Sequence, residues 1–175
     1  MATNRISISA VICTHNRADC LPAAIESVLQ QDLTPDRFEL IVVDNRSNDG
    51  THDVVSGFGD RVKLVKEPIL GLSNARNAGW RAAQGVYVAM LDDDAVADPA
   101  WLRHILAAFE ETRPEPACVG GRVWPIWESP RPAWLSDRTL LNLTVIDWSE
   151  VPHAVTDFQR EWLAGANLAF PRAVL

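Results

Sequence analysis

The chain has 175 residues, and 47% of them are hydrophobic, which favours a single globular domain with a buried core. Its formal net charge of −7 argues against binding nucleic acid through the overall electrostatic field, but a phosphate ligand held through a divalent cation stays compatible with it. The three cysteines, Cys13, Cys20 and Cys118, show no disulfide or metal-binding spacing, so we expect reduced thiols.

Apolar runs and helical spacings alternate from Ile6 to Thr112. The predicted strands are Ile6–Cys13, Phe38–Val43, Val62–Val65 and Tyr87–Leu91. The predicted helices are Ala18–Gln31, a turn after the NRSNDGT stretch, Ser73–Gln84 with Ser73 as its cap, and a helix that starts at Asp98 and Pro99 and runs to Thr112. This alternation predicts an α/β fold with right-handed βαβ units and a mostly parallel sheet flanked by helices.

The sequence from Pro114 to Phe158 differs from the rest because it is rich in proline and tryptophan. We predict mostly loop there, with a strand at Cys118–Val123. A further strand is predicted at Trp162–Phe170, and a helix at Pro171. An average helix has about 11 residues, but the sequence stops at Leu175, inside that helix. We therefore expect the chain to be an N-terminal fragment of a longer protein.

Three consecutive acidic residues follow the fourth predicted strand, at the sheet edge where α/β proteins bind ligands. In an extended segment residues i and i+2 face the same way, so we expect Asp92 and Asp94 to converge on one cation, with Asp93 beside them. Carboxylate oxygens suit Mg²⁺ or Mn²⁺. The alternative is a solvated turn or a helix cap, although Asp98 is better placed to cap the next helix.

Asp44 ends the second predicted strand. Its carboxylate can accept a hydrogen bond from the imide N–H of uracil or thymine, which would help to select a pyrimidine base. The ordinary alternative is an Asx turn with Ser47 or Asn48.

Two further groups of polar residues are predicted at the same edge. Thr14, Asn16 and Arg17 follow the first strand and serve either a ligand or ordinary loop and cap chemistry. Arg76 lies on the third helix, and its planar guanidinium suits phosphate. An exposed helix arginine with no ligand is the alternative.

Five motifs occur in a fixed order, namely VICTHNR, LIVVDNRSNDGT, GLSNARNAGWRAAQG, VAMLDDDA and WLAGANLAF. Together they resemble family 2 glycosyltransferases along nearly the whole chain. The resemblance implies a single GT-A domain over residues 1–175, with a nucleotide-sugar-binding half at 1–113 and the start of an acceptor half at 114–175. It also implies inverting, Mn²⁺- or Mg²⁺-dependent transfer from a UDP- or dTDP-sugar to a hydroxyl of a glycan or lipid-linked glycan.

The resemblance assigns roles residue by residue. Asp44 matches the base-binding residue, and Asp92 and Asp94 match the DxD-type metal pair. The remaining substrate-binding matches are Thr14, Asn16, Arg17, Arg76, Asp93, Gly165, Ala166 and Asn167. This sequence departs from the family in having Cys13 where proline is frequent and Ala95 where many members have a further acid.

The catalytic base is not identified by these motifs. An inverting transfer needs a carboxylate that deprotonates the acceptor hydroxyl. In the family this acid usually follows the GANLAF-like strand, so we expect it beyond Leu175. Asp157 and Glu161 are weak candidates inside the chain.

Other interpretations stay open at this stage. A sugar-nucleotide nucleotidyltransferase would need a Gly-rich basic loop that CTHNRADC lacks, and a non-catalytic nucleotide- or carbohydrate-binding module would need no base. The tryptophans either complete a core or form an acceptor surface, because aromatic faces stack on sugars. We expect no signal peptide, no membrane span and a cytoplasmic location, with contact to the inner face of the membrane as an alternative.

Overall fold

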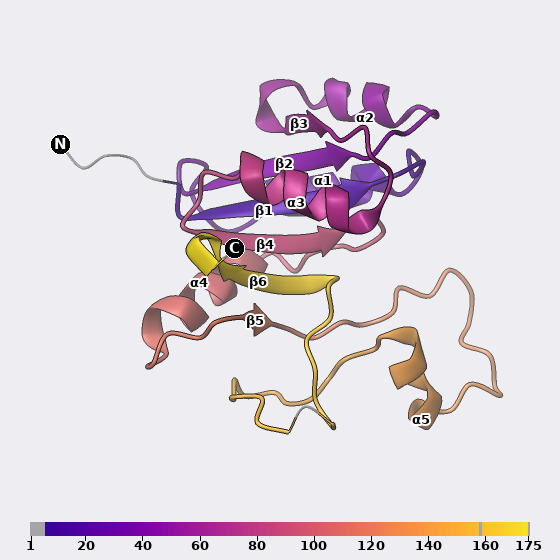
Figure 1. Ribbon diagram of the computed structural model, residues 1–175. Helices are drawn as coiled ribbons and strands as arrows, with labels where there is room; N and C mark the ends of the chain where they lie inside the picture. The colour runs from indigo at the N-terminus through magenta and orange to yellow at the C-terminus, as the bar shows by residue number, and fades with distance from the viewer. Residues whose placement is uncertain (1–5, 158, 175) are drawn as a thin grey trace.

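The computed structural model of the protein describes residues 6–157 and 159–174, so Phe158 and Leu175, which close two of the predicted stretches, lie outside it (Figure 1). Within this part of the chain, a six-stranded sheet has the order β3-β2-β1-β4-β6-β5. Its strands are β1 (Ile8–Thr14), β2 (Phe38–Asp44), β3 (Lys63–Lys66), β4 (Tyr87–Asp92), β5 (Val119–Gly120) and β6 (Asn167–Pro171).

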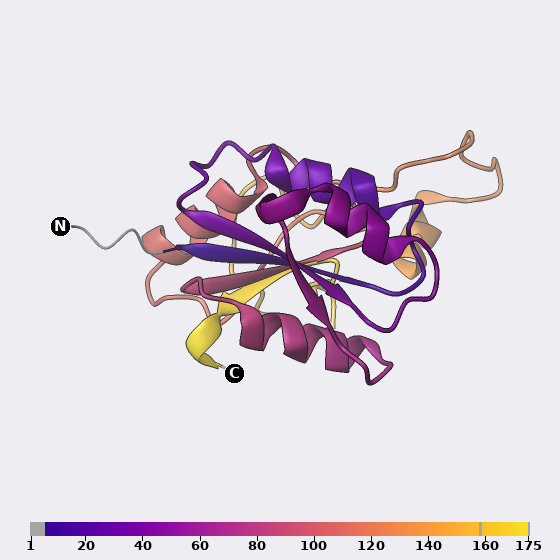
Figure 2. The same ribbon diagram turned by 90° about the horizontal axis from the view of Figure 1, so that it is seen from above.

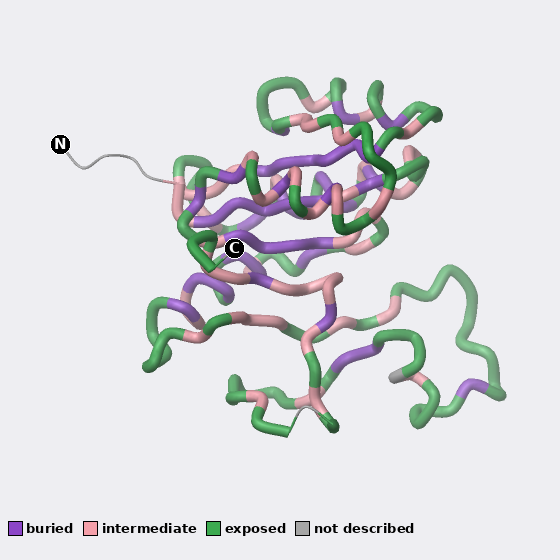
Figure 3. The backbone as a smooth tube through the Cα atoms, in the orientation of Figure 1, coloured by how far each residue is buried: buried purple, intermediate pink, exposed green. Residues whose placement is uncertain are grey.

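The first four strands of the chain are parallel to one another, as the sequence predicts. Their register places Thr14 opposite Asp44 and Cys13 opposite Asp92, so the ends of β1, β2 and β4 meet at one edge. β6 runs antiparallel to β4 and pairs with β5 in the same way. The apolar runs of β1 and β2 are buried on both faces, which is why they read as continuous β-branched stretches. Figure 3 shows this buried centre.

Helices cover both faces of the sheet (Figure 2). They are α1 (Leu21–Leu29), α2 (Thr51–Gly57), α3 (Leu72–Ala82) and α4 (Trp101–Glu111). The short α5 (Asp137–Leu140) lies away from the sheet (Figure 1). α1, α2 and α4 contribute to one core cluster, whereas α3 packs on the opposite face. Small residues allow α3 to lie close to the sheet, since a methyl group on Gly79 would come within 2.4 Å of Val11 Cγ1.

Some predicted helix starts are wrong. α4 begins at Trp101, because the Asp98 carboxylate accepts a hydrogen bond from Ala100 N in the preceding turn and does not cap the helix. Ser73 lies inside α3, whose N-cap is Gly71 with a φ of 139°, a conformation that favours glycine.

The strands that follow α4 are shorter than predicted. β5 contains two residues of the predicted Cys118–Val123, and β6 starts at Asn167 instead of Trp162. Pro171 ends β6, and a 3-10 turn over Arg172–Val174 follows it.

The proline- and tryptophan-rich segment between α4 and β6 is mostly irregular. It contains α5, a 3-10 turn at Leu141–Leu143 and an isolated bridge between Val123 and Ile146. Trp124 and Trp134 are 61% and 80% exposed, so these two do not complete a core. Trp148 and Trp162 contact each other edge to face, with their ring centroids 4.9 Å apart. Across the described residues, no helix is both long and apolar enough for a bilayer.

Candidate functional site

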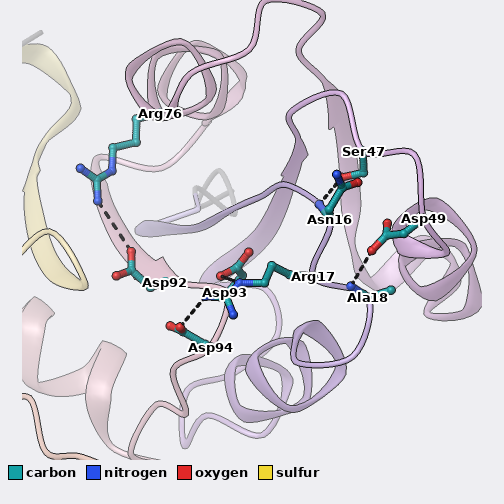
Figure 4. A network of polar contacts seen from close by, with 9 residues as sticks. All are labelled: Asn16, Arg17, Ala18, Ser47, Asp49, Arg76, Asp92, Asp93 and Asp94. Atoms are coloured by element: carbon teal, nitrogen blue, oxygen red, sulfur yellow. Dashed lines mark hydrogen bonds and ion pairs between the residues drawn. The ribbon is translucent and has the colours of Figure 1, made fainter.

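The loops that follow β1 and β2 are tied together at the carboxyl edge of the sheet (Figure 4). Asn16, with a φ of 54°, donates its backbone N–H to Ser47 Oγ at 3.0 Å, and its side-chain oxygen accepts the N–H of Asn48 at 2.8 Å. Asp49 accepts the N–H of Ala18 at 3.1 Å. Asn16 therefore acts as a link between the two loops, and its oxygen is already used within the protein.

Asp44 is 7% exposed at the end of β2, and its Oδ1 accepts the N–H of Ser47 at 2.8 Å. The Asx turn considered from the sequence is therefore present. It occupies one of the two carboxylate oxygens, which leaves the hydrogen-bonding capacity of the second for a ligand.

Asn45 is the residue that the sequence patterns missed. It is 4% exposed, and its amide nitrogen donates to the carbonyls of Glu67 at 3.1 Å and Ile69 at 2.8 Å. Its oxygen accepts the N–H of Gly71 at 2.7 Å. One side chain thus holds the loop between β3 and α3 against the end of β2, and so sets where α3 begins.

The acidic stretch does not continue as a strand, so the geometric basis for convergence of Asp92 and Asp94 was wrong. β4 ends at Asp92, and Asp93 and Asp94 lie in a turn where Ala95 N donates to Asp92 O at 3.2 Å. Side chains alternate between the two faces only within the strand, and this alternation ends where the turn begins.

Two arginines face the three acids at this edge (Figure 4). Asp92 Oδ1 lies 3.6 Å from Arg76 Nη2, and Asp94 Oδ2 lies 2.8 Å from Arg17 Nη2. Arg17 Nε is also 3.8 Å from Asp93 Oδ1. These two arginines come from the loop after β1 and from α3, so five of the predicted site residues lie in two neighbouring sets of ion pairs at this edge.

Burial governs the electrostatics here. Desolvation raises the pKa of Asp92, against the opposing effect of Arg76, and raises the pKa of Asp93, against Thr14 and Arg17. Desolvation also raises the pKa of Cys13 to about 12, so this thiol is not a reactive thiolate.

The hydroxyl of Thr14 is buried at the end of β1. Its oxygen has no hydrogen-bond partner among the described residues, although it lies close enough to Asp93 to lower that residue's pKa. An unpaired buried hydroxyl is unusual in a folded protein. At a predicted ligand edge, it marks a polar atom that a bound group can satisfy.

The donor set fits a hard divalent cation in its chemistry. Asp92 and Asp94 are 44% and 51% exposed, and both present carboxylate oxygens. Within the described part of the chain, no three His, Cys, Asp or Glu side chains converge into a metal cage. Magnesium-type sites commonly combine one or two carboxylates with water and substrate phosphate, so the pair suits a site completed by its ligand.

The GANLAF segment lies beside Arg76 and α4. A methyl group on Gly165 would come within 2.6 Å of Arg76 Nη2. Asn167 donates to Arg122 O at 3.0 Å and accepts from Trp101 Nε1 at 2.8 Å. Its amide therefore joins α4 to the loop after β5, and Ala166 precedes it in a turn.

The two acids suggested as bases have partners of their own. Glu161 Oε2 is 2.9 Å from His153 Nε2, and this hydrogen bond raises the pKa of His153. Asp157 accepts the N–H of Gln159 at 3.1 Å and lies 3.5 Å from Arg160. Among the described residues, no hydrogen bond or ion pair joins either acid to the network at the end of β4.

A parallel sheet with acids and arginines at its carboxyl edge, followed by an antiparallel strand pair, defines a GT-A type of glycosyltransferase fold. The chain belongs to glycosyl transferase family 2, because the family's sequence model, described as "Glycosyl transferase family 2", matches residues 9–169. The family predicted from the five motifs is thus confirmed.

A curated relative and two solved structures show the extent of the likeness. The chain is 31% identical over 138 residues to a glucosyl-dolichyl phosphate glucuronosyltransferase of Haloferax volcanii, covering 76% of this chain and 43% of the relative. A mannosyltransferase of Pyrobaculum calidifontis, solved in complex with GDP-Man and Mn²⁺, superposes with a TM-score of 0.68 at 23% identity. The match covers 98% of this chain and 46% of the mannosyltransferase chain. S. aureus TarS 1–349 in complex with UDP-GlcNAc superposes with a TM-score of 0.58 at 23% identity. The match covers 69% of this chain and 37% of the TarS chain. The chain therefore spans less than half of each.

Proposed function

We propose that this chain forms the donor-binding part of a glycosyltransferase that takes a sugar from a UDP- or dTDP-sugar in the presence of Mn²⁺ or Mg²⁺. The observation that carries the proposal is the network at the end of β4, where Asp92 and Asp94 pair with Arg76 and Arg17 at the same sheet edge as the buried Asp44. The names of the solved neighbours support a nucleoside-diphosphate sugar as the class of donor.

Different residues bind different parts of the donor. Asp44 accepts the imide N–H of the base through the carboxylate oxygen that Ser47 leaves available. Thr14 offers its unpaired hydroxyl to the nucleotide, and Arg17 and Arg76 pair with the diphosphate. Gly165 and Ala166 border the sugar, and Asn167 keeps that border in place through its two internal hydrogen bonds.

Asp92 and Asp94 would hold the cation, while Asp93 Oδ1 lies 3.8 Å from Arg17 Nε. When bound, the cation stabilises negative charge on the departing diphosphate. Most of the barrier reduction then comes from positioning the donor and from charge stabilisation.

Transfer with inversion also needs a base for the acceptor hydroxyl, and general-base assistance typically contributes about 10²–10⁴-fold. Asp157 and Glu161 are engaged with neighbouring side chains in a segment away from the acidic network. We therefore place the base, together with the rest of the acceptor side, outside the 175 residues.

Thermal unfolding with a panel of nucleotides tests the proposal. UDP and dTDP with Mn²⁺ should raise the melting temperature, because a ligand at about 100 times its dissociation constant stabilises by roughly 2.7 kcal/mol. ADP is the control, since adenine has no imide N–H for Asp44. Stabilisation by GDP alone would redirect the base assignment, and no stabilisation by any nucleoside diphosphate with metal would refute the proposal.

A further inference from the structure

The metal-site acids are not free in the ligand-free protein. The guanidinium of Arg17 lies 2.8 Å from Asp94 Oδ2 and 3.8 Å from Asp93 Oδ1, so it competes with a cation for Asp94, one of the two proposed metal ligands (Figure 4). The pair joins residues 77 positions apart in the sequence, from the loop after β1 and the turn after β4. Arg17 is thus an internal cation that already occupies one of the two proposed metal ligands, Asp94.

Hydrogen bonds hold the backbone around Arg17, whereas its side chain is about half exposed. The N–H groups of Cys20 and Leu21 donate to Arg17 O at 3.2 and 3.1 Å. On either side, Asn16 N and Ala18 N are bound to Ser47 and Asp49. The side chain itself is 47% exposed and its partner Asp94 is 51% exposed. A rotamer change of one side chain is therefore enough to break the pair.

A diphosphate gives this guanidinium another partner. Carboxylate and phosphate both match the planar fork of arginine, so Arg17 can exchange one oxyanion for the other without losing a charge-assisted hydrogen bond. An exposed ion pair is also weak, which keeps the exchange possible.

We propose that Arg17 gates metal binding: without nucleotide it holds Asp94, and a bound diphosphate draws the guanidinium away and frees Asp94 for the cation. This inference rests on the proposed function. It makes metal and nucleotide bind cooperatively, and each must strengthen the other by the same factor because the coupling is reciprocal. Arg76 is a weaker competitor, since it stands 3.6 Å from Asp92 and packs against Gly165.

The gate is tested first with Mn²⁺ alone, measured by calorimetry or by the paramagnetic signal of free Mn²⁺. Arg17→Gln should bind Mn²⁺ about two- to fivefold more tightly than the unaltered chain, the range expected for one exposed ion pair. Arg17→Lys keeps the charge and should bind Mn²⁺ like the unaltered chain. Raising the salt concentration should shrink the difference, because exposed pairs are screened.

Two arginines serve as controls. Arg103→Gln breaks the ion pair between Arg103 and Asp32. This pair resembles the Arg17–Asp94 pair in its N–O distance, 2.9 Å, and in its exposure, but it lies outside the proposed site. Arg46→Gln removes one charge from the loop after β2, where this arginine has no ion pair among the described residues. Neither should change Mn²⁺ affinity. Equal tightening by Arg46→Gln would show that general charge, not the gate, is responsible and would overturn the inference.

The second measurement is the ratio of Mn²⁺ affinities with and without UDP. This ratio should be smaller in Arg17→Gln than in the unaltered chain, because the cost of opening the pair is gone. Unchanged or weaker Mn²⁺ binding by Arg17→Gln without nucleotide overturns the gate even if the unaltered chain binds UDP with metal. Failure of the unaltered chain to bind any nucleoside diphosphate instead counts against the proposed function, and the measurement with Mn²⁺ alone separates the two results.

Discussion

Gly165 and Arg76 are packed so closely that the size of one residue sets the position of the other. A methyl group on Gly165 would lie 2.6 Å from Arg76 Nη2 and 3.1 Å from Arg76 Nη1. The same Nη2 atom is 3.6 Å from Asp92 Oδ1. The segment that leads into β6 therefore supports the arginine that faces the acidic end of β4.

Gly165→Ala should displace the Arg76 guanidinium and weaken binding of UDP with Mn²⁺ by about tenfold, the loss expected for one hydrogen bond to a charged group. Calorimetry measures this directly. Gly57→Ala is the matched control, because a methyl group at Gly57 has nothing within 4 Å. Equal affinities for the two variants would remove Arg76 from the proposed diphosphate site.

Asn45→Ala should lower the free energy of unfolding by roughly 3 kcal/mol, because the carbonyls of Glu67 and Ile69 and the N–H of Gly71 lose their partner. Urea unfolding measures the change. Asn77→Ala, at an exposed position of α3, should stay within about 0.5 kcal/mol. A similar small effect for Asn45→Ala would show that water replaces the three hydrogen bonds.

The sequence predicted the positions of the parallel strands well because each contains a local apolar run, such as Ala10–Cys13 in β1 and Leu40–Val43 in β2. Side-chain direction at the end of β4 could not be predicted in this way, since the turn at Asp93 cancels the strand alternation. Asn45 was missed because its partners are backbone atoms 22 to 26 residues away, with no pattern of their own. The arginine partners of the acids depend on tertiary packing, as does the exposure of Trp134.

Asp44→Asn should weaken binding of UDP by about tenfold with or without metal. Asparagine keeps an oxygen that can accept the N–H of Ser47, so the Asx turn and the melting temperature should change little. The amide nitrogen, however, is a donor and repels the imide N–H. Calorimetry with UDP, and with ADP as the non-imide ligand, checks the prediction; loss of stability without loss of UDP affinity would mean that Asp44 serves only the turn.

Asp93→Asn should stabilise the ligand-free protein at neutral pH. Burial raises the pKa of Asp93 in spite of the lowering effects of Thr14 and Arg17, so ionised Asp93 destabilises the folded state relative to the unfolded chain. The pKa of Asp93 is higher in the folded protein than its ordinary value of 3.8. The destabilisation by ionised Asp93 is therefore complete when the pH is above the folded-state pKa, and it is absent when the pH is below 3.8. Asparagine carries no such penalty at any pH.

The unfolding free energy of Asp93→Asn should therefore exceed that of the unaltered chain at neutral pH, and the excess should shrink as the pH falls toward 3.8. Urea unfolding of the variant and of the unaltered chain, at a series of pH values and constant salt, measures the two free energies of unfolding for comparison. A difference that does not depend on pH would trace the effect to packing. Destabilisation at neutral pH would instead show that the attraction of Arg17, 3.8 Å away, outweighs burial in the ligand-free state.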